Sequence, residues 1–488
     1  MAFYIGIDLG TSAIKVILLD EWQIEHAAIS VPLEVLRPYA GWSEQNPDDW
    51  WQGVESALDQ MAHTCSEKMA SLRAIGLSGQ MHGLVALDKD DTVLRHAILW
   101  NDTRASAEAE ALDRDEPAFR QRGGNMVMAG FTAPKALWMV RHEPDLFARI
   151  NTILLPKDYI RFCLSGEKIS DMSDASGTLW LDIAGRRWSD TLLEACGLSI
   201  EQMPKLVEGS QLGGYLRTGL CQKWGIRQPV IIAGGAGDNA AAAIGLGITQ
   251  PEQSFVSLGT SGVVFSVTDS FVQQADKAAH AFCHALPDSW HQMGVILSAT
   301  DSLNWLSETL GQHVPELLAQ MNTEDSAKSL PLFHPYLGGE RTPHNNPNAK
   351  GGFFGLSRTD NAGDMTRAIL QGVAFAIADA RDTLDIADKP ASQMIATGGG
   401  ANNTYWLTLI ASLTNCPIGV PKHANTGAAL GAARLGMMAD GMHIEQVCYA
   451  PEMAQIIKPD VRLAQALSNA RKTSKNIYQL TSELYSFK

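Results

Sequence analysis

The sequence predicts an α/β protein of two similar lobes, on three observations. Its 488 residues are too many for one ordinary domain and suit two large lobes. The tetrapeptide Leu-Gly-Thr-Ser occurs twice, at residues 9–12 and 258–261, about half the chain apart, which indicates an internal duplication. Between the copies, strand-like runs at 74–78 and 229–233 alternate with helix-like segments such as 135–143, as in α/β proteins.

The boundary between the lobes is predicted near residue 247. Gly245, Gly247 and Pro251 interrupt the chain just before the second Leu-Gly-Thr-Ser, and such residues punctuate the chain between folded elements. The predicted lobes are therefore residues 1–247 and residues 248–488.

The composition disfavours several classes of function. The chain has 38 basic and 53 acidic side chains, a net charge of −15, so no overall positive field attracts nucleic acid or anionic lipid. The seven cysteines are scattered, odd in number and without metal-ligand spacing, which fits reduced thiols in the cytoplasm. The N-terminus lacks the features of a signal peptide, and no apolar run is long enough to span a membrane. We therefore expect a cytoplasmic protein with no nucleic-acid or membrane partner.

The duplicated tetrapeptide suggests a pair of phosphate-binding turns. In each copy an apolar run precedes Gly-Thr-Ser and a β-branched run follows, which is typical of two strands joined by a tight turn. Successive backbone N–H groups in such a turn form a concave site for phosphate oxygens, and the hydroxyls add donors. One copy would be an ordinary turn, whereas two equivalent copies favour phosphate binding. The residues concerned are Gly10, Thr11 and Ser12 in the first copy and Gly259, Thr260 and Ser261 in the second.

A third glycine turn precedes Asp238. Three glycines between residues 234 and 237 follow a strand-like run, and an alanine-rich helix-like segment comes next. An aspartate at a helix start is a preferred N-cap. The end of a strand in an open α/β sheet is also where ligands bind, so a catalytic carboxylate is an equal alternative on the sequence alone.

Residues 398–400 form a further glycine turn, followed by Asn402 and Asn403. Backbone without side chains lets a flat ring or a ribose approach closely. The chain contains no G-x-G-x-x-G fingerprint, Walker A loop, H-R-D loop or G-x-S-x-G elbow, which disfavours dinucleotide-binding, P-loop, protein-kinase and α/β-hydrolase interpretations.

The last glycine-bounded turn places Gln80, Met81 and His82 between two strand-like runs. This mixture of polar and apolar side chains suits contact with a sugar. Taken alone, His82 is better interpreted as an ordinary loop histidine. No H-x-x-x-H or H-E-x-x-H pair suggests a zinc site.

Together these motifs resemble the FGGY family of carbohydrate kinases, and the resemblance covers essentially the whole chain. Both longer family signatures are present, one at residues 131–138 and the other at residues 352–356 with 364–371. The resemblance implies the duplicated, ribonuclease H-like ATPase fold shared by actin, hexokinase and heat-shock chaperones, with a central ligand cleft.

The resemblance also implies transfer of a phosphoryl group from ATP, with Mg²⁺, to a primary hydroxyl of a sugar. Residues 78–83, 99–104 and 335–344 are most similar to the family members that act on D-xylulose, in pentose catabolism. Glycerol is disfavoured, because glycerol kinases have Gln-Arg-Glu-Thr where this chain has Gln-Met-His-Gly at residues 80–83. Another ketopentose, a polyol, or a non-catalytic ATP-binding relative of the same fold are the alternatives.

Family roles carried over residue by residue make Asp238 the general base, ionised through its place at a helix N-terminus. Asp8 matches an aspartate near the phosphates and Mg²⁺, which it would hold through water. The expected sugar contacts are Gln80, Met81, His82, Asn101, Asp102 and Asn239. The expected ATP contacts are Gly10, Thr11, Ser12, Lys15, Gly259, Thr260, Ser261, Gly399, Gly400 and Asn403.

Three points stay open at this stage. Lys15 stands where glycerol kinases carry an arginine, so its charge is kept and the bidentate geometry is lost. Either Asn402 or Asn403 contacts adenosine. The expected partners are a small-molecule sugar and ATP, and the oligomeric state, a homodimer among the options, is undetermined.

Overall fold

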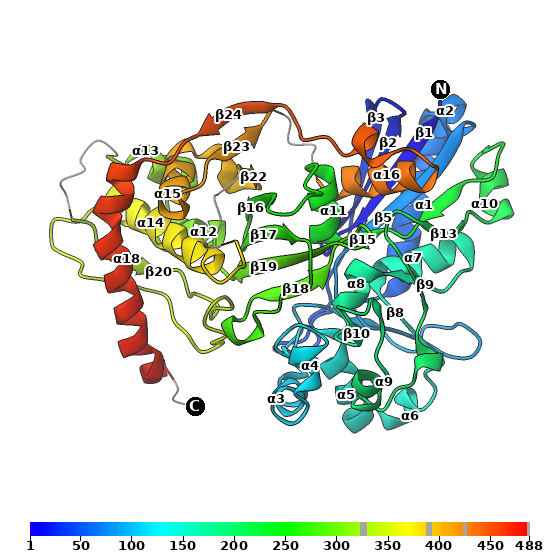
Figure 1. The fold of residues 1–488 in the computed structure, drawn as a ribbon, viewed down its shortest axis with the longest axis horizontal. Coiled ribbons are helices and arrows are strands. Elements are labelled where there is room, and N and C mark those ends of the chain that lie inside the picture. The colour runs from blue at the N-terminus through cyan, green and yellow to red at the C-terminus, as the bar shows by residue number, and fades with distance from the viewer. Residues whose placement is uncertain (323–328, 387–392, 423–426, 486–488) are drawn as a thin grey trace.

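The computed structural model describes residues 1–322, 329–386, 393–422 and 427–485. Within these residues it contains two large mixed sheets that lie side by side and carry helices on their faces (Figure 1). The first sheet has the strand order β13-β14-β5-β1-β2-β3, with β15 paired to β5. The strands are β1 (Phe3–Leu9), β2 (Ala13–Asp20), β3 (Glu25–Pro32), β5 (Leu72–Gly79), β13 (Leu212–Tyr215), β14 (Ile231–Ala233) and β15 (Ala236–Gly237).

The second sheet repeats the arrangement of the first, with the order β18-β19-β17-β16-β22-β23-β24. In both sheets the strand that precedes Gly-Thr-Ser is antiparallel to the next strand and parallel to a later one: β1 pairs in this way with β2 and β5, and β16 with β17 and β22. The strands are β16 (Ser254–Leu258), β17 (Gly262–Thr268), β18 (His280–Cys283), β19 (Trp290–Ile296), β22 (Met394–Thr397), β23 (Ile418–Pro421) and β24 (Met453–Ile457). The predicted duplicated α/β fold is confirmed.

The main helices lie on the two sheets or in the region below the first sheet in the view of Figure 1. Those of the first half are α1 (Pro47–Thr64), α3 (Ser106–Asp115), α5 (Thr132–His142), α7 (Pro156–Ser165), α8 (Met172–Ser176) and α11 (Asp238–Gly245). Those of the second half are α12 (Thr300–Leu310), α13 (Val314–Ala319), α14 (Ala362–Arg381), α15 (Thr404–Thr414), α16 (Ala428–Ala439) and α18 (Val461–Thr481).

The minor elements lie in the connections between these strands and helices. The short helices are α2 (Ser66–Met69), α4 (Ala118–Gln121), α6 (Pro144–Phe147), α9 (Asp190–Glu194), α10 (Thr218–Lys223) and α17 (Ile444–Val447). The short strands are β4 (Glu44–Gln45), β6 (Val85–Leu87), β7 (Ala97–Ile98), β8 (Thr152–Leu154), β9 (Ile169–Asp171), β10 (Leu181–Asp182), β11 (Arg187–Trp188), β12 (Lys205–Val207), β20 (Leu332–His334) and β21 (Gly352–Phe354).

Helix α14 forms the core of the second half. Asn361 caps it by accepting a hydrogen bond from the backbone N–H of Asp364, whose carboxylate accepts one from the N–H of Asn361. This reciprocal arrangement satisfies donors that a helix start leaves unpaired. Val373 and Ile377, on one face of the helix, are fully buried.

Helix α16 belongs to the second half in sequence but packs on the first sheet, beside β1 and β5 (Figure 1). A Cβ atom at Gly6 would lie 1.9 Å from the carbonyl oxygen of Ala429, and one at Gly76 would lie 1.6 Å from that of Ala432. Only glycine permits so close an approach of helix to strand. Segments after residue 247 therefore help to build both halves of the molecule.

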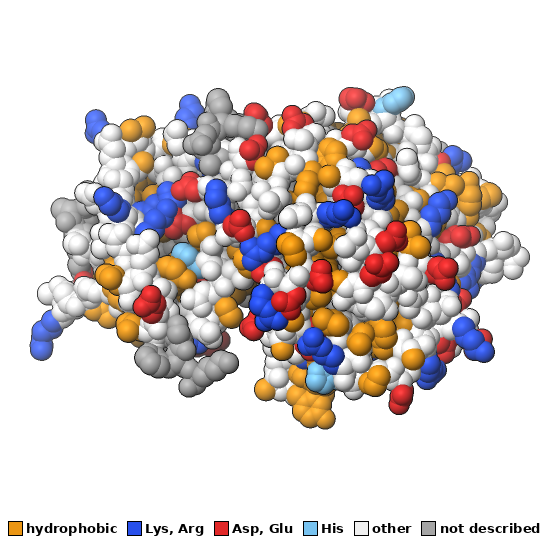
Figure 2. Space-filling model, turned by 60° about the horizontal axis from the view of Figure 1, so that its bottom comes forward, with side chains coloured by type: hydrophobic (Ala, Val, Ile, Leu, Met, Phe, Trp, Pro, Cys, Tyr) orange, Lys and Arg blue, Asp and Glu red, His pale blue; other side chains and the backbone are white. Residues whose placement is uncertain are grey.

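The surface carries charged side chains of both signs. Figure 2 shows acidic and basic side chains interspersed over the face it displays, without a continuous basic patch. Within the described part of the chain, no helix combines the length and apolar character needed to cross a bilayer.

Candidate active site

The first phosphate turn joins β1 to β2 and is held by side chains. The backbone N–H of Gly10 closes the turn on the carbonyl of Ala13 at 3.0 Å. The Thr11 hydroxyl donates to Oε1 of Gln80 at 3.1 Å and accepts from the indole N–H of Trp100 at 3.0 Å. Because the single hydroxyl hydrogen of Thr11 is used in this way, a phosphate at the turn depends on backbone N–H groups and the exposed Ser12.

Gln80 lies inside the hydrogen-bond network behind this turn. Its side chain is 2% exposed, and its amide donates to Oε1 of Gln45 at 2.9 Å. The Gln45 amide in turn donates to the carbonyl of Thr11 at 2.8 Å. The sequence predicted Gln80 as a sugar contact, and the structure makes it a link between the phosphate turn and the sugar loop, defined as residues 80–83. No motif indicated Gln45.

Asp8 stands at the end of β1, directly before this turn. Its Oδ1 accepts a hydrogen bond from the Ser78 hydroxyl at 3.0 Å, and Lys15 is its partner across the β1–β2 ladder. Burial raises the pKa of Asp8, and the Ser78 hydrogen bond and the Lys15 charge partly offset this effect.

Asp238 is the first residue of α11, and the N-cap position is taken by Gly237. Both the backbone N–H and the side-chain amide of Asn239 donate to its Oδ1, at 2.6 and 2.8 Å. Asn239, expected to contact the sugar, thus holds the carboxylate of Asp238. The N-cap interpretation of Asp238 is wrong, because its carboxylate binds the adjacent residue and caps no N–H further along the helix.

Burial, and next the negative charge of nearby Asp8, raise the pKa of Asp238 to about 6. The place of Asp238 at a helix N-terminus favours its ionised form, and this form still predominates at neutral pH, although the net shift of the pKa is upward. Removal from water and a like charge outweigh the helix dipole and the bonds from Asn239. A carboxylate with this pKa is ionised at neutral pH and is a better proton acceptor than an ordinary aspartate.

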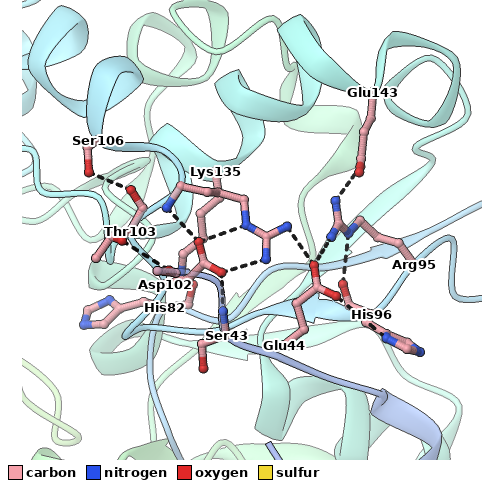
Figure 3. A network of polar contacts seen from close by, with 12 residues as sticks. Ser43, Glu44, His82, Arg95, His96, Asp102, Thr103, Ser106, Lys135 and Glu143 are labelled. Atoms are coloured by element: carbon pink, nitrogen blue, oxygen red, sulfur yellow. Dashed lines mark hydrogen bonds and ion pairs between the residues drawn. The ribbon is translucent and has the colours of Figure 1, made fainter. Parts of the chain in front are cut away.

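His82 is held in a left-handed backbone conformation, with φ of 69°, that a non-glycine residue rarely adopts. Its carbonyl accepts hydrogen bonds from the Thr132 hydroxyl at 3.0 Å and from Nζ of Lys135 at 2.8 Å. Lys135 belongs to a family signature and is fully buried (Figure 3). These two donors fix the backbone that presents the imidazole.

The imidazole of His82 is neutral and has a defined tautomer. Its Nδ1 lies 2.7 Å from the carbonyl oxygen of Gly177, so Nδ1 carries the proton and Nε2 is an acceptor. Burial, assisted by the positive charges of Lys135 and Arg341, lowers the pKa of His82 to about 3. His82 therefore suits accepting a hydrogen bond from a sugar hydroxyl.

Met81 connects the sugar loop to the loop of the base. A Cβ atom at Gly237 would lie 2.8 Å from Sδ of Met81, and one at Gly177 would lie 2.9 Å from its Cε. The thioether thus packs between the residue before Asp238 and the residue that holds His82.

Asp102 is fully engaged within the protein. Its carboxylate accepts hydrogen bonds from the backbone N–H groups of Ser43 and Arg104, and the Arg104 guanidinium binds both oxygens. In Figure 3 the carboxylate points into a polar network that also contains Glu44, whereas the imidazole of His82 points away from it. Asp102 therefore has no acceptor left for a sugar. The adjacent Asn101 has a buried Oδ1 without a hydrogen-bond partner in the described part of the chain, which suits a ligand contact.

The second phosphate turn lies against the glycine turn at residues 398–400. The carbonyl of Gly259 accepts hydrogen bonds from the N–H and the hydroxyl of Thr300, at 2.9 and 2.8 Å. Gly398 has a φ of 86°, and a Cβ atom there would lie 2.7 Å from the carbonyl oxygen of Leu258. Thr260 is exposed, and Ser261 is half-buried.

A cavity of about 380 Å³ lies beside this second pair of turns. Gly399, Gly400, Asn402 and Asn403 form one wall, as the sequence predicted for a nucleotide site. Asn403 uses its Oδ1 to cap α15 through the N–H of Trp406 at 3.0 Å, whereas Asn402 is exposed. The opposite wall consists of Thr300, Leu303, Asn304, Val314 and Leu318 of α12 and α13, which no motif indicated.

The described residues contain no group of three or more histidine, cysteine, aspartate or glutamate side chains arranged around a metal ion. A magnesium ion bound mainly by phosphate oxygens and water needs only one or two carboxylates. Asp8, half-buried before a phosphate turn and with one oxygen bonded to Ser78, fits that requirement.

The match to known families covers both halves of the chain. The N-terminal domain of the FGGY family of carbohydrate kinases matches residues 3–245, and the C-terminal domain of the same family matches residues 255–439. The chain belongs to the FGGY family of carbohydrate kinases. It is therefore a carbohydrate kinase built on two actin-like ATPase halves.

Individual relatives within the FGGY family are similar over nearly the whole chain. A xylulose kinase of Escherichia coli K12 is 44% identical over 479 residues, which are 98% of this chain and 98% of the relative. A xylulose kinase of Klebsiella pneumoniae is 46% identical, over 89% of this chain and 90% of the relative. The crystal structure of a xyloylose kinase from Brucella ovis matches 99% of this chain and 100% of its own, with 47% identity and a TM-score of 0.96.

Proposed function

We propose that this FGGY kinase transfers the γ-phosphoryl group of ATP to a primary hydroxyl of D-xylulose, giving D-xylulose 5-phosphate and ADP in the cytoplasm. The observation that carries the proposal is the position of Asp238. It lies close enough to Asp8 at the first phosphate turn for the two charges to interact, and Met81 of the sugar loop packs on the residue before it. A base, a phosphate site and a sugar loop therefore meet at one place. The xylulose kinases among the relatives support the choice of sugar.

In the proposed reaction Asp238 accepts a hydrogen bond from the attacking hydroxyl and takes its proton late. Phosphoryl transfer has a loose transition state, so positioning and charge neutralisation contribute more than a strong base. The bonds from Asn239 leave one oxygen of Asp238, Oδ2, to face the substrate. Nε2 of neutral His82 accepts a hydroxyl of the sugar.

The nucleotide binds to both halves in this proposal. The phosphates lie between the two Gly-Thr-Ser turns, and the adenosine occupies the cavity beside Gly399 and Gly400. Asn402 is the better candidate for an adenosine contact, because the side-chain oxygen of Asn403 already caps α15. Asp8 would hold Mg²⁺, directly or through water, and the ion would neutralise phosphate charge.

The experiment is ADP release at fixed Mg²⁺-ATP with D-xylulose, L-xylulose, D-ribulose, L-ribulose, glycerol or gluconate, and with Asp238→Asn as the blank. The proposal predicts a strong preference for D-xylulose that disappears in the blank. A higher rate with another sugar would keep the kinase and change its substrate. No turnover with any of them would favour a non-catalytic ATP-binding protein.

A further inference from the structure

Arg341 lies in a segment on which the family resemblance rests but to which the mechanism assigns no role. The segment is anchored to the end of β19 on both sides of this residue. Oε1 of Glu340 accepts hydrogen bonds from the backbone N–H groups of Leu297 and Arg341, at 3.0 and 2.7 Å. The Thr342 hydroxyl accepts one from the N–H of Val295 at 3.0 Å. The backbone of Arg341 is thereby fixed.

The guanidinium of Arg341 contacts a histidine whose tautomer is defined. Nη1 of Arg341 lies 3.3 Å from Nε2 of His280. Nδ1 of His280 lies 3.0 Å from Oδ1 of Asn125, and that oxygen also accepts the N–H of Ala281. Nδ1 of His280 therefore carries the proton, and its Nε2 is the acceptor for Arg341.

His280 is connected to the sugar loop of the other half through the ring of Phe131. Its ring stacks on Phe282 and packs against the edge of Phe131, with centroids 5.6 Å apart in both cases. The ring of Phe131 lies 4.7 Å from that of His82. Burial is the main cause of the lowered pKa values of His82 and His280, and the nearby charge of Arg341 lowers both further.

The neighbouring carboxyl of Glu340 is directed away from full ionisation. Burial raises its pKa to about 8, which favours the protonated form near neutral pH, and its Oε2 is buried without a hydrogen-bond partner in the described structure. A guanidinium stays charged under these conditions. Arg341 and His82 are both only half-buried, so each keeps a solvent-facing side.

We propose that Arg341 is a sugar-binding residue contributed by the second half, and that its guanidinium donates hydrogen bonds to the carbonyl oxygen of the ketose. The inference rests on the proposed function. A hydroxyl of the sugar donates to Nε2 of His82, while the carbonyl, which only accepts, requires a donor such as Arg341. The sugar thereby contacts both halves of the enzyme, whereas the sugar contacts expected from the sequence all lie in the first.

The test compares Arg341→Gln and Arg341→Lys with Arg358→Gln, which removes an exposed arginine from the same half. D-xylulose binding is measured directly by calorimetry, KM values for sugar and ATP are measured by turnover, and Tm is recorded for every variant. Arg341→Gln should weaken D-xylulose binding about 10- to 100-fold and leave KM for ATP within about threefold, because an unmade bond to a buried polar group is costly. Arg341→Lys keeps the charge but loses the planar donors, so its D-xylulose affinity should lie between those of the wild type and Arg341→Gln. Arg358→Gln should resemble the wild type.

Xylitol, which lacks the carbonyl, separates the proposed contact from a general one. Its inhibition constant should change less than about threefold in Arg341→Gln. Equal weakening of xylitol and D-xylulose would overturn the assignment to the carbonyl. Unchanged D-xylulose binding in Arg341→Gln would overturn the role of Arg341. If Arg341→Gln does not fold, the same comparison of D-xylulose and xylitol is made with Arg341→Lys. A wild type that binds but phosphorylates no sugar would overturn the proposed function instead.

Discussion

The two halves of the molecule have the same sheet arrangement and differ at the residues around the ends of the central strands. Asp8 precedes the first Gly-Thr-Ser turn, and Ser257 occupies the equivalent position before the second. Across the ladder, Asp8 faces Lys15, whereas Ser257 faces Val263. The first half thus places charges at its turn, and the second half places small or apolar groups.

The loops after the parallel neighbour strands differ in the same way. Strand β5 leads into the sugar loop with His82, and the equivalent strand β22 leads into the glycine turn beside the cavity. One backbone arrangement therefore provides polar side chains in the first half and bare backbone in the second. In the proposed reaction the first half therefore supplies the base and the sugar-binding side chains, and the second half supplies the glycine turn beside the nucleotide cavity.

The largest expected difference is between Asp8→Asn and Ser257→Ala, substitutions at equivalent positions. Asp8→Asn should lower kcat about 100-fold or more, because it removes the carboxylate that would hold the metal ion at the transferring phosphate. Ser257→Ala should stay within about threefold of the wild type. Steady-state kinetics with saturating substrates measure both, and similar losses would show that the halves are functionally equivalent.

The next pair separates the two ligand sites. His82→Ala should raise KM for the sugar about 10- to 100-fold and change KM for ATP little. Gly399→Val should raise KM for ATP about tenfold and change KM for the sugar little. No atom of the described residues lies within 4 Å of a Cβ at Gly399, and this residue lines the cavity. Initial rates with each substrate varied in turn provide the four constants. A higher KM for ATP in the His82 variant, together with a higher KM for the sugar in the Gly399 variant, would mean that the two ligand sites are exchanged.

The acidic limb of the pH profile should report the base in the first half. Because the pKa of Asp238 is about 6, kcat/KM should fall tenfold per unit below pH 6 and be flat from pH 7 to 8. His82, with a pKa of about 3, contributes nothing in this range. Residual activity of Asp8→Asn should show a limb at lower pH, because the charge of Asp8 raises the pKa of Asp238. An unmoved limb would contradict the interaction of the two carboxylates.

The smallest effect is on stability. A carboxyl group whose pKa is raised by folding stabilises the protein below its unfolded pKa, near 4, and this stabilisation is lost as pH rises through about 6. Asp238→Asn removes a buried charge and should therefore stabilise the enzyme by about 1–3 kcal/mol at pH 8 and less at pH 5. Denaturant unfolding at both pH values provides the comparison. An equal change in the free energy of unfolding at both pH values would show that the stabilisation does not come from the ionisation of Asp238.

The sequence predicted the duplicated fold, and it indicated both Gly-Thr-Ser turns and Asp238 as candidate sites, because each follows a local backbone pattern that glycine makes visible. It could not predict that Gln80 and Asp102 are occupied by other protein groups, because Gln45 and Arg104 bind them through side-chain contacts that carry no motif. The raised pKa of Asp238 was likewise invisible, since it depends on burial and on a residue from a distant strand. The α12–α13 wall of the cavity lies in helices of ordinary composition.

The most direct test of the account is single-turnover phosphoryl transfer by Asp238→Asn at saturating Mg²⁺-ATP and D-xylulose, together with calorimetric binding of the sugar. The account predicts a transfer rate at least about 100-fold below that of the wild type and a sugar Kd within about threefold. A transfer rate near that of the wild type would contradict it, because the base would then lie elsewhere.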